Sequence, residues 1–250
     1  MPYPRYDLQH VEDVSQRPTT TDYDRYLWLV KLIRRASCDE RNIYRCNPFL
    51  VKDVLFSAIL VDANEALLDI AEVVGASDGE WELIVGWAER GRQGLAACWD
   101  ENLKLCLDYD LRAAKPLRVR TVAGFAPLIA GQQSSERLEA LLGVLDSTAF
   151  KASSGLRWPL PPSTSPEELA FHPRRYWRGP VWPVINWLLW RALRRNGERE
   201  RAEDLRRASL KQLESEGFGE YFDPYTGEPL GSISQSWTAA VALDFLMGGL

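Results

Sequence analysis

Apolar residues recur at helical spacing along most of the chain. The first stripe, Tyr23, Tyr26, Leu27, Val30 and Ile33, predicts a helix over residues 21–36. Thr21 is a favoured N-cap residue, and Asp22 and Asp24 follow in the first turn, where the helix dipole favours negative charge. Residues 1–20 have no such stripe and are read as an extended lead-in.

A second stripe predicts a long helix from about residue 50 to 74, and its members are expected on a buried face: Leu60, Ala63, Leu67, Ile70 and Val74. Gly75 ends this helix well, because glycine accepts the left-handed conformation. A third helix is predicted over residues 78–96. Residues 97–118 alternate weakly, which leaves a short strand pair or an irregular excursion open.

The second half of the chain continues in the same way. Shorter helices are predicted near 121–130 and 134–147, followed by a proline-rich connection over 150–180. Further helices are predicted from Ile185 to the Asn196-Gly197 pair, over the charged residues 198–216, and from Ser234 or Ser236 to about 247. About eight helices without a βαβ pattern indicate an all-α protein, with residues 1–250 forming a single domain.

Composition narrows the function classes. The net charge of −5 disfavours nucleic acid as a partner. Four cysteines without C-x-x-C spacing and only two histidines argue against a zinc site, so no metal or cofactor is expected. No signal peptide is recognised at the start and no apolar run is long enough for a bilayer, which favours a cytoplasmic setting.

Two loop segments carry unusual chemistry. Residues 171–183, "FHPRRYWRGPVWP", gather aromatic residues, arginines and a glycine ahead of a helix. Aromatic faces stack on sugar rings and arginine donates to hydroxyls or carboxylates, although a tryptophan-rich plug at the helix entry explains the same composition. In residues 217–237, "GFGEYFDPYTGEPLGSISQSW", Glu220 lies between turn-forming residues. By spacing alone, Glu220 is better explained as an exposed residue than as a catalytic one, and Asp223 is interpreted as a turn-forming residue.

Together these segments resemble the (α/α)6-barrel glycoside hydrolases of family 63, in particular the mannosylglycerate and glucosylglycerate hydrolases. The matching motifs are Y-W-R-G-P-x-W at 176–182, E-Y-x-D-P-x-T-G-E at 220–228 and S-W-T-A-A at 236–240. The opening residues 3–30 also resemble a segment of those enzymes, so the likeness covers essentially the whole chain.

The resemblance implies an inverting mechanism, in which one carboxyl group protonates the leaving oxygen and a second activates water. Glu220 matches the general base. The positions that match the substrate pocket are Tyr176, Trp177, Arg178, Gly179, Trp182, Gln235 and Trp237. An anionic aglycone such as glycerate would suit Arg174, Arg175 or Arg178, while Arg178 is favoured as a brace of its own loop through backbone carbonyls. The sequence does not separate manno from gluco substrates, and oligosaccharide α-glucosidases of the broader group stay possible.

The family's acid-bearing motif, E-S-G-x-D-N-S-P-R-W, has no counterpart in these residues. Asp7, Asp13 and Asp22 lack its flanking residues. A complete six-hairpin toroid has twelve helices, against about eight here, so the resemblance implies an incomplete toroid without its N-terminal third. Three hypotheses follow: a glycosidase that is complete only with the missing segment, an inactive carbohydrate-binding remnant or subunit, and a chain whose uncovered seam drives homo-oligomerisation.

Overall fold

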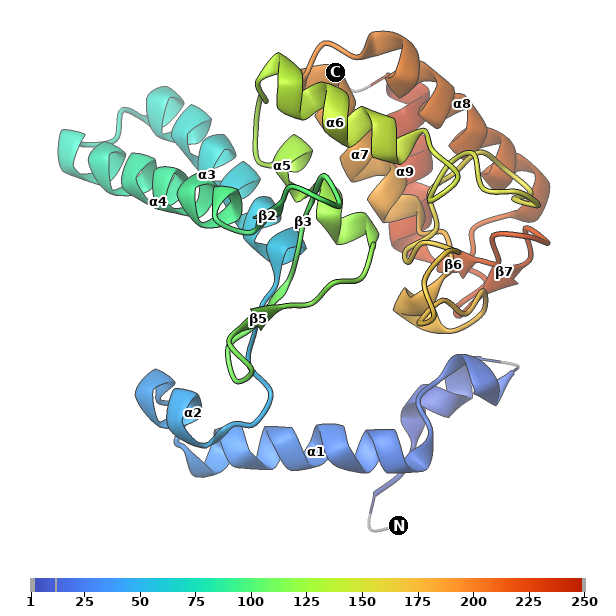
Figure 1. Cartoon of the computed structure of the whole chain (residues 1–250), viewed down its shortest axis with the longest axis horizontal. Helices are drawn as coiled ribbons and strands as arrows, with labels where there is room; N and C mark the ends of the chain where they lie inside the picture. Colours follow the sequence, from blue (N-terminus) through green and yellow to red (C-terminus); the bar gives the residue numbers. More distant parts are fainter. Residues whose placement is uncertain (1–2, 12, 249–250) are drawn as a thin grey trace.

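The computed structural model describes residues 3–11 and 13–248, and α-helices dominate it (Figure 1). The α-helices are α1 (Thr20–Arg35), α2 (Glu40–Cys46), α3 (Val54–Val74), α4 (Asp78–Ala96), α5 (Ala126–Ile129), α6 (Ser135–Leu145), α7 (Pro183–Arg195), α8 (Arg199–Glu216) and α9 (Ser236–Met247). Within the described residues, four 3-10 helices accompany them: η1 (Tyr6–His10), η2 (Val14–Gln16), η3 (Val122–Phe125) and η4 (Tyr176–Arg178). The predicted all-α class is confirmed.

The strands are two-residue antiparallel pairs. β1 (Val51–Lys52), β4 (Tyr109–Asp110) and β5 (Lys115–Pro116) form one small sheet, β2 (Trp99–Asp100) pairs with β3 (Leu105–Cys106), and β6 (Tyr221–Phe222) pairs with β7 (Pro229–Leu230). Residues 97–118 therefore form strand pairs, the first of the two alternatives that the sequence left open.

Helix ends follow local capping chemistry. Ser77 and Glu80 form a reciprocal capping box that starts α4, and Gly75 ends α3 in the left-handed conformation, as expected. The predicted N-cap of α1 was wrong by two residues, because the Thr19 side chain is the one that accepts the Asp22 N–H. The helix expected from about residue 50 begins at Val54, where Asp53 caps it, and α2 was not predicted at all.

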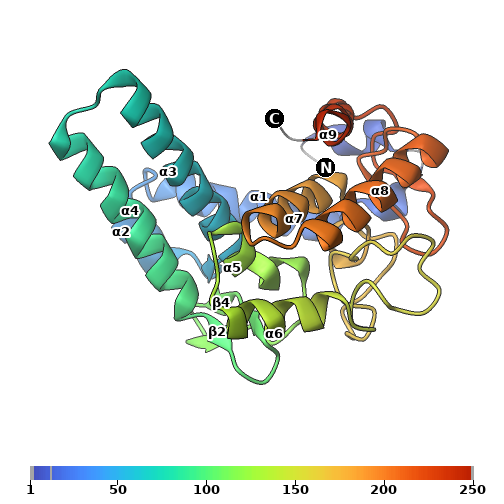
Figure 2. The same ribbon diagram turned by 90° about the horizontal axis from the view of Figure 1, so that it is seen from above.

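The core lies where α5, α6, α7 and α8 meet η3 and the loop after α6. Its largest fully buried side chains include Phe125, Phe150, Trp182, Leu189 and Phe245. Helices α7 and α8 form one hairpin, and α3 and α4 form another that projects from the body (Figure 2). Gly91 of α4 allows close approach in this second hairpin, because a Cβ there would lie 2.4 Å from Cγ2 of Val61.

The predicted buried stripe on α3 was wrong. Leu60, Ala63, Leu67, Ile70 and Val74 are all exposed. The buried positions are instead Val54, Ala58, Val61, Asn64 and Ala71, which lie on the side of α3 that meets α4 and η3. The helix is apolar around most of its circumference, so periodicity alone did not identify the covered side.

The lead-in was predicted to be extended, but it is not extended throughout. It contains η1 and η2, and Asp13 caps η2 by accepting the Ser15 N–H. After it α1 runs apart from the helical body (Figure 1), and no residue of α1 is buried. None of the helices in the described part of the chain combines the length and apolarity that a membrane crossing needs.

Candidate active site

Glu220 stands at the start of the β6–β7 hairpin, directly before Tyr221. The hairpin turn is built by Asp223, whose carboxylate accepts the backbone N–H groups of Tyr225 and Thr226. The interpretation of Asp223 as a turn-forming residue is confirmed. The turn fixes where the two strands meet, with Tyr221 opposite Leu230, and so fixes the backbone that carries Glu220.

The Glu220 side chain is buried, with 7% of the residue exposed, so the exposed glutamate that spacing favoured is not what the fold contains. Its backbone N–H donates to the Ser232 carbonyl at 2.7 Å. Its Oε2 accepts the Ser232 N–H at 3.2 Å and faces Nη2 of Arg17 at 3.5 Å. One backbone donor and one cation offset the free-energy cost of burying this carboxylate, which keeps lone pairs for another partner.

Gly231 makes room for this carboxylate. Its φ of +70° lies in the left-handed region, and a Cβ at this position would lie 2.4 Å from Oε2 of Glu220 and 2.6 Å from Cε1 of Tyr221. Only glycine combines that backbone conformation with so close an approach. Position 231 therefore determines whether the Glu220 carboxylate can occupy its observed place.

The lead-in supplies two residues that the sequence reasoning missed. Gln16 is buried and its Oε1 accepts the Gly231 N–H at 2.8 Å, while the neighbouring Arg17 pairs with Glu220. These contacts join positions more than 200 residues apart along the chain. The only signal for them in the sequence was the resemblance of residues 3–30 to the family, which carried no role for either residue.

Two buried donors beside Glu220 have no hydrogen-bond partner within the described residues. They are Nε of Arg17 and the hydroxyl of Tyr221. Burial raises the pKa of Tyr221, and burial together with the Glu220 carboxylate raises the pKa of Tyr176, so both phenols stay protonated and able to donate. Unsatisfied donors next to a carboxylate suit a water molecule or a hydroxyl-rich ligand.

An aromatic cluster adjoins the carboxylate. Trp177 stacks on Trp182 with ring centroids 3.9 Å apart, and Trp182 stacks on Tyr221 at 4.7 Å. Tyr176 meets Trp177, Trp182 and Tyr221 edge-on, and Trp237 meets Trp182 in the same way. Trp182 is only 1% exposed, whereas Trp177 and Trp237 are each 42% exposed. The open aromatic surface thus belongs to Trp177 and Trp237, and Trp182 supports Trp177 from behind.

The two loops singled out from the sequence lie side by side. Val181 and Phe222 exchange both backbone hydrogen bonds at 2.9 Å, which joins the loop before α7 to the strand after Glu220. Gly179 is needed for this path, because a Cβ there would lie 2.4 Å from the His172 carbonyl oxygen. Nε of Arg178 donates to the Ala170 carbonyl at 2.9 Å, so its predicted role as a brace of the loop is confirmed.

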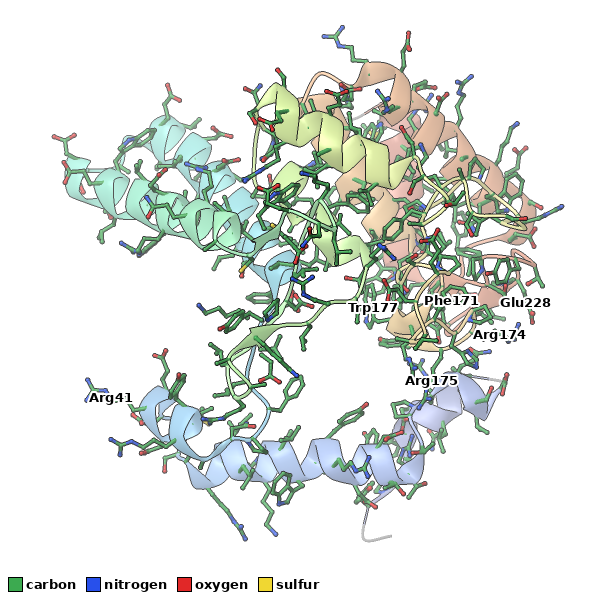
Figure 3. The ribbon with its side chains drawn as sticks, in the orientation of Figure 1. Arg41, Phe171, Arg174, Arg175, Trp177 and Glu228 are labelled. Carbon is green, nitrogen blue, oxygen red and sulfur yellow. The ribbon has the colours of Figure 1, made fainter. Side chains whose placement is uncertain are left out.

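The neighbouring arginines are matched by carboxylates. Arg174 pairs with Glu228 at 2.5 Å and with Asp223 at 3.6 Å, and Arg175 pairs with Asp22 at 3.4 Å. Figure 3 shows Arg174, Arg175 and Glu228 at the edge of the body that faces the lead-in. Arg17, which was not among the predicted arginines, is the cation that stands next to Glu220.

The start of α9 completes the surroundings of the base. Gln235 occupies the N-cap position of α9 without a side-chain capping bond. Its backbone N–H donates to the Phe218 carbonyl at 2.8 Å, and the Thr238 hydroxyl donates to the Gly219 carbonyl at 2.8 Å. These bonds hold Gln235 and Trp237 against the loop that carries Glu220. The substrate contacts predicted for the aromatic residues, Arg178, Gly179 and Gln235 stay predictions. Over the described residues, no group of three or more His, Cys, Asp or Glu side chains could hold a metal ion.

A buried carboxylate, spare donors and an open aromatic surface are features that glycoside hydrolase sites use. The chain belongs to the family described as the mannosylglycerate hydrolase MGH1-like glycoside hydrolase domain, which matches residues 3–238. The resemblance noted in the sequence is therefore confirmed.

Individual relatives agree with the family. The glucosylglycerate hydrolase of Mycolicibacterium hassiacum is 42% identical over 98% of this chain, and the mannosylglycerate hydrolase of Thermus thermophilus is 42% identical over 97%. The chain spans only 55% and 56% of these two proteins. A crystal structure of a Thermus thermophilus family 63 mannosylglycerate hydrolase in complex with Tris, 41% identical in sequence, aligns with a TM-score of 0.88, covering 99% of this chain and 57% of that one. The architecture is thus an incomplete (α/α)6 toroid, as predicted.

Proposed function

We propose that this chain supplies the base-bearing part of an inverting α-glycosidase that hydrolyses mannosylglycerate or glucosylglycerate to the sugar and glycerate. Glu220 is the general base and activates the attacking water. The observation that carries this proposal is the burial of Glu220 beside Arg17 and beside two donors that have no partner in the part of the chain that the structure describes. Such a carboxylate can accept a proton from a water that those donors help to orient.

The sugar is proposed to stack on Trp177 and Trp237, the two exposed members of the aromatic cluster. Tyr176, Gly179 and Trp182 shape the surface behind them, and Gln235 contributes a polar contact. The substrate class is proposed from the similarity to a glucosylglycerate hydrolase and a mannosylglycerate hydrolase, and both sugars remain part of the proposal. The single domain and the cytoplasmic setting expected from the sequence also stay predictions.

The general acid is proposed to lie outside residues 1–250. An inverting enzyme needs a protonated carboxyl roughly 6.5–9.5 Å from the base. Of the aspartates considered from the sequence, hydrogen bonds from Arg5, Ser15 and Thr19 hold the pKa of Asp7, Asp13 and Asp22, respectively, below the usual range. Carboxyl groups with lowered pKa values are ionised near neutral pH, which is the wrong state for a general acid.

The test uses this chain combined with the part of the Thermus thermophilus relative that it does not match, hereafter the complementing segment. Glu220→Gln removes the base while keeping the size of the side chain. We expect turnover of both glycosylglycerates to fall by at least about a thousand-fold, with sugar binding measured by calorimetry nearly unchanged. Undiminished turnover in this variant refutes the role of Glu220. Binding without hydrolysis by the unaltered combination supports the inactive remnant instead.

A further inference from the structure

The turn that follows β7 carries the backbone to which Glu220 is bonded. The Ser232 carbonyl accepts the Glu220 N–H at 2.7 Å, and the Ser232 N–H donates to Oε2 of Glu220 at 3.2 Å. Ser232 therefore holds both the main chain and the side chain of Glu220. A rotation of the peptide group between Gly231 and Ser232 would turn this backbone donor away from the carboxylate.

Gly231 is the residue about which that peptide group would rotate. Glycine leaves room for the carboxylate, but it also has the widest choice of φ and ψ of any residue. The strand β7 ends at Leu230, where it pairs with Tyr221, so the strand pairing does not reach Gly231. The residue that admits the carboxylate thus needs another group to keep its backbone in one conformation.

Gln16 supplies that group. Its Oε1 accepts the buried Gly231 N–H at 2.8 Å, and only 6% of Gln16 is exposed. Because a buried N–H without an acceptor is costly, this bond favours the one conformation of Gly231 in which the N–H faces Gln16. The bond therefore restrains the direction of the Ser232 N–H as well.

Gln16 is itself held in place by the lead-in. It is the last residue of η2, and its own N–H bonds to the Asp13 carbonyl at 3.1 Å. The Asp13 carboxylate lies 4.0 Å from Arg174, which pairs with Glu228 in the turn of the β6–β7 hairpin. In Figure 1 the lead-in lies below this hairpin. Contacts at both ends of the hairpin thus fix where Gln16 stands.

We infer that Gln16 is a positioning residue for the general base. Its side chain holds Gly231, the conformation of Gly231 directs the Ser232 N–H, and the Ser232 N–H orients the Glu220 carboxylate. Gln16 acts through these groups and needs no contact with the substrate. The inference deepens the proposed function and rests on it for the role of Glu220.

The test replaces Gln16 by methionine, which keeps the approximate size of the side chain and removes its oxygen acceptor. The kinetics are measured on this chain combined with the complementing segment. We expect kcat to fall by about ten-fold or more while KM changes by less than about three-fold, because the base is displaced and the stacking surface is not. An unchanged kcat overturns the inference, and so does a loss that appears only in KM.

Gln133→Met is the matched control. Nε2 of Gln133 donates to the Pro127 and Gly131 carbonyls at 2.6 and 3.1 Å, between α5 and α6, so the same substitution breaks backbone contacts away from Glu220. We expect this variant to keep kcat within about two-fold, whatever its melting temperature. Equal losses of kcat in the two variants contradict a positioning role. If Gln16→Met does not fold, Gln16→Asn carries the same expectation, because its amide is one methylene too short to reach Gly231.

A readout without turnover separates this inference from the proposed function. This chain is labelled with a carbon isotope at its glutamate carboxyl groups, and the Glu220 resonance is assigned by its loss in Glu220→Gln. We expect Gln16→Met to shift that resonance and Gln133→Met to leave it in place. A complex that hydrolyses neither glycosylglycerate but shows this shift refutes the glycosidase and upholds the role of Gln16. Hydrolysis with kcat and the resonance both unchanged by Gln16→Met upholds the glycosidase and overturns the inference.

Discussion

Replacement of Gly231 by alanine tests whether the exact place of the Glu220 carboxylate matters for turnover. The added Cβ would lie 2.4 Å from Oε2, and since side-chain carbons do not approach within 3.0 Å of other atoms, the carboxylate must move by at least about 0.6 Å. Displacements near 1 Å at a reacting group cost on the order of 100-fold in rate. The left-handed backbone adds a loss of stability of roughly 1–2 kcal/mol.

Gly75→Ala is the matched control. Gly75 has a φ of +71° against +70° at Gly231, but its Cβ would meet nothing within 4 Å. Both variants therefore carry similar backbone strain, and only one disturbs Glu220. In the complex with the complementing segment, we expect the kcat of Gly231→Ala to fall by roughly 30–100-fold and that of Gly75→Ala to stay within about two-fold. Equal kcat values for the two variants, with both folded by circular dichroism, refute the packing argument.

Further predictions concern Arg17, Trp177, Asp108 and Asp146. Arg17→Met leaves the buried Glu220 carboxylate without its cation, and steady-state kinetics should show a loss of at least about ten-fold in kcat. The control Arg207→Met, which breaks an exposed ion pair with Asp204 on α8, should change kcat by less than about two-fold. Trp177→Ala removes an exposed stacking face, so KM should rise by about ten-fold or more with a much smaller change in kcat. Burial raises the pKa of Asp108, so the stability that this carboxyl group contributes is present in acid and is lost as the pH rises through that pKa. Asp108→Asn should therefore raise the melting temperature at pH 7, and the gain should shrink toward about pH 3. Burial also tends to raise the pKa of Asp146, but the bonds to Arg201 and Lys151 outweigh burial and lower that pKa. Asp146→Asn should therefore destabilise the chain at pH 7, and this loss of stability should vanish in acid. Thermal unfolding of the pair across this pH range checks both signs, and the same sign for the two variants contradicts the assignment.

Local rules accounted for most helices. The span 78–96 was predicted at both ends. Its start is fixed by a box of Ser77 and Glu80, which depends only on residues three positions apart. The end of α3 at Gly75 and the turn at Asp223 could also be predicted from the sequence, since each depends on bonds within a few residues. The short helix α2 was missed because it has no apolar stripe of sufficient length.

The stripe on α3 shows what periodicity cannot decide. Val61 and Ala71 are buried while Leu60 and Ile70, one position away, are exposed. Both sets are apolar, so hydrophobicity does not distinguish them. The choice is made by α4, whose Gly91 admits Val61 at close range, and by the absence of a covering neighbour on the other side among the described residues.

The sequence by itself determined the helical class, the family and the two loops that meet at the site, because these depend on short-range pattern and on motifs of fixed spacing. Tertiary structure decided which partners Glu220 has. Gln16 and Arg17 reach the base loop from the opposite end of the chain, and Gly231 lets the carboxylate approach its backbone. Contacts between residues so far apart depend on how the whole chain packs, and no local spacing encodes them.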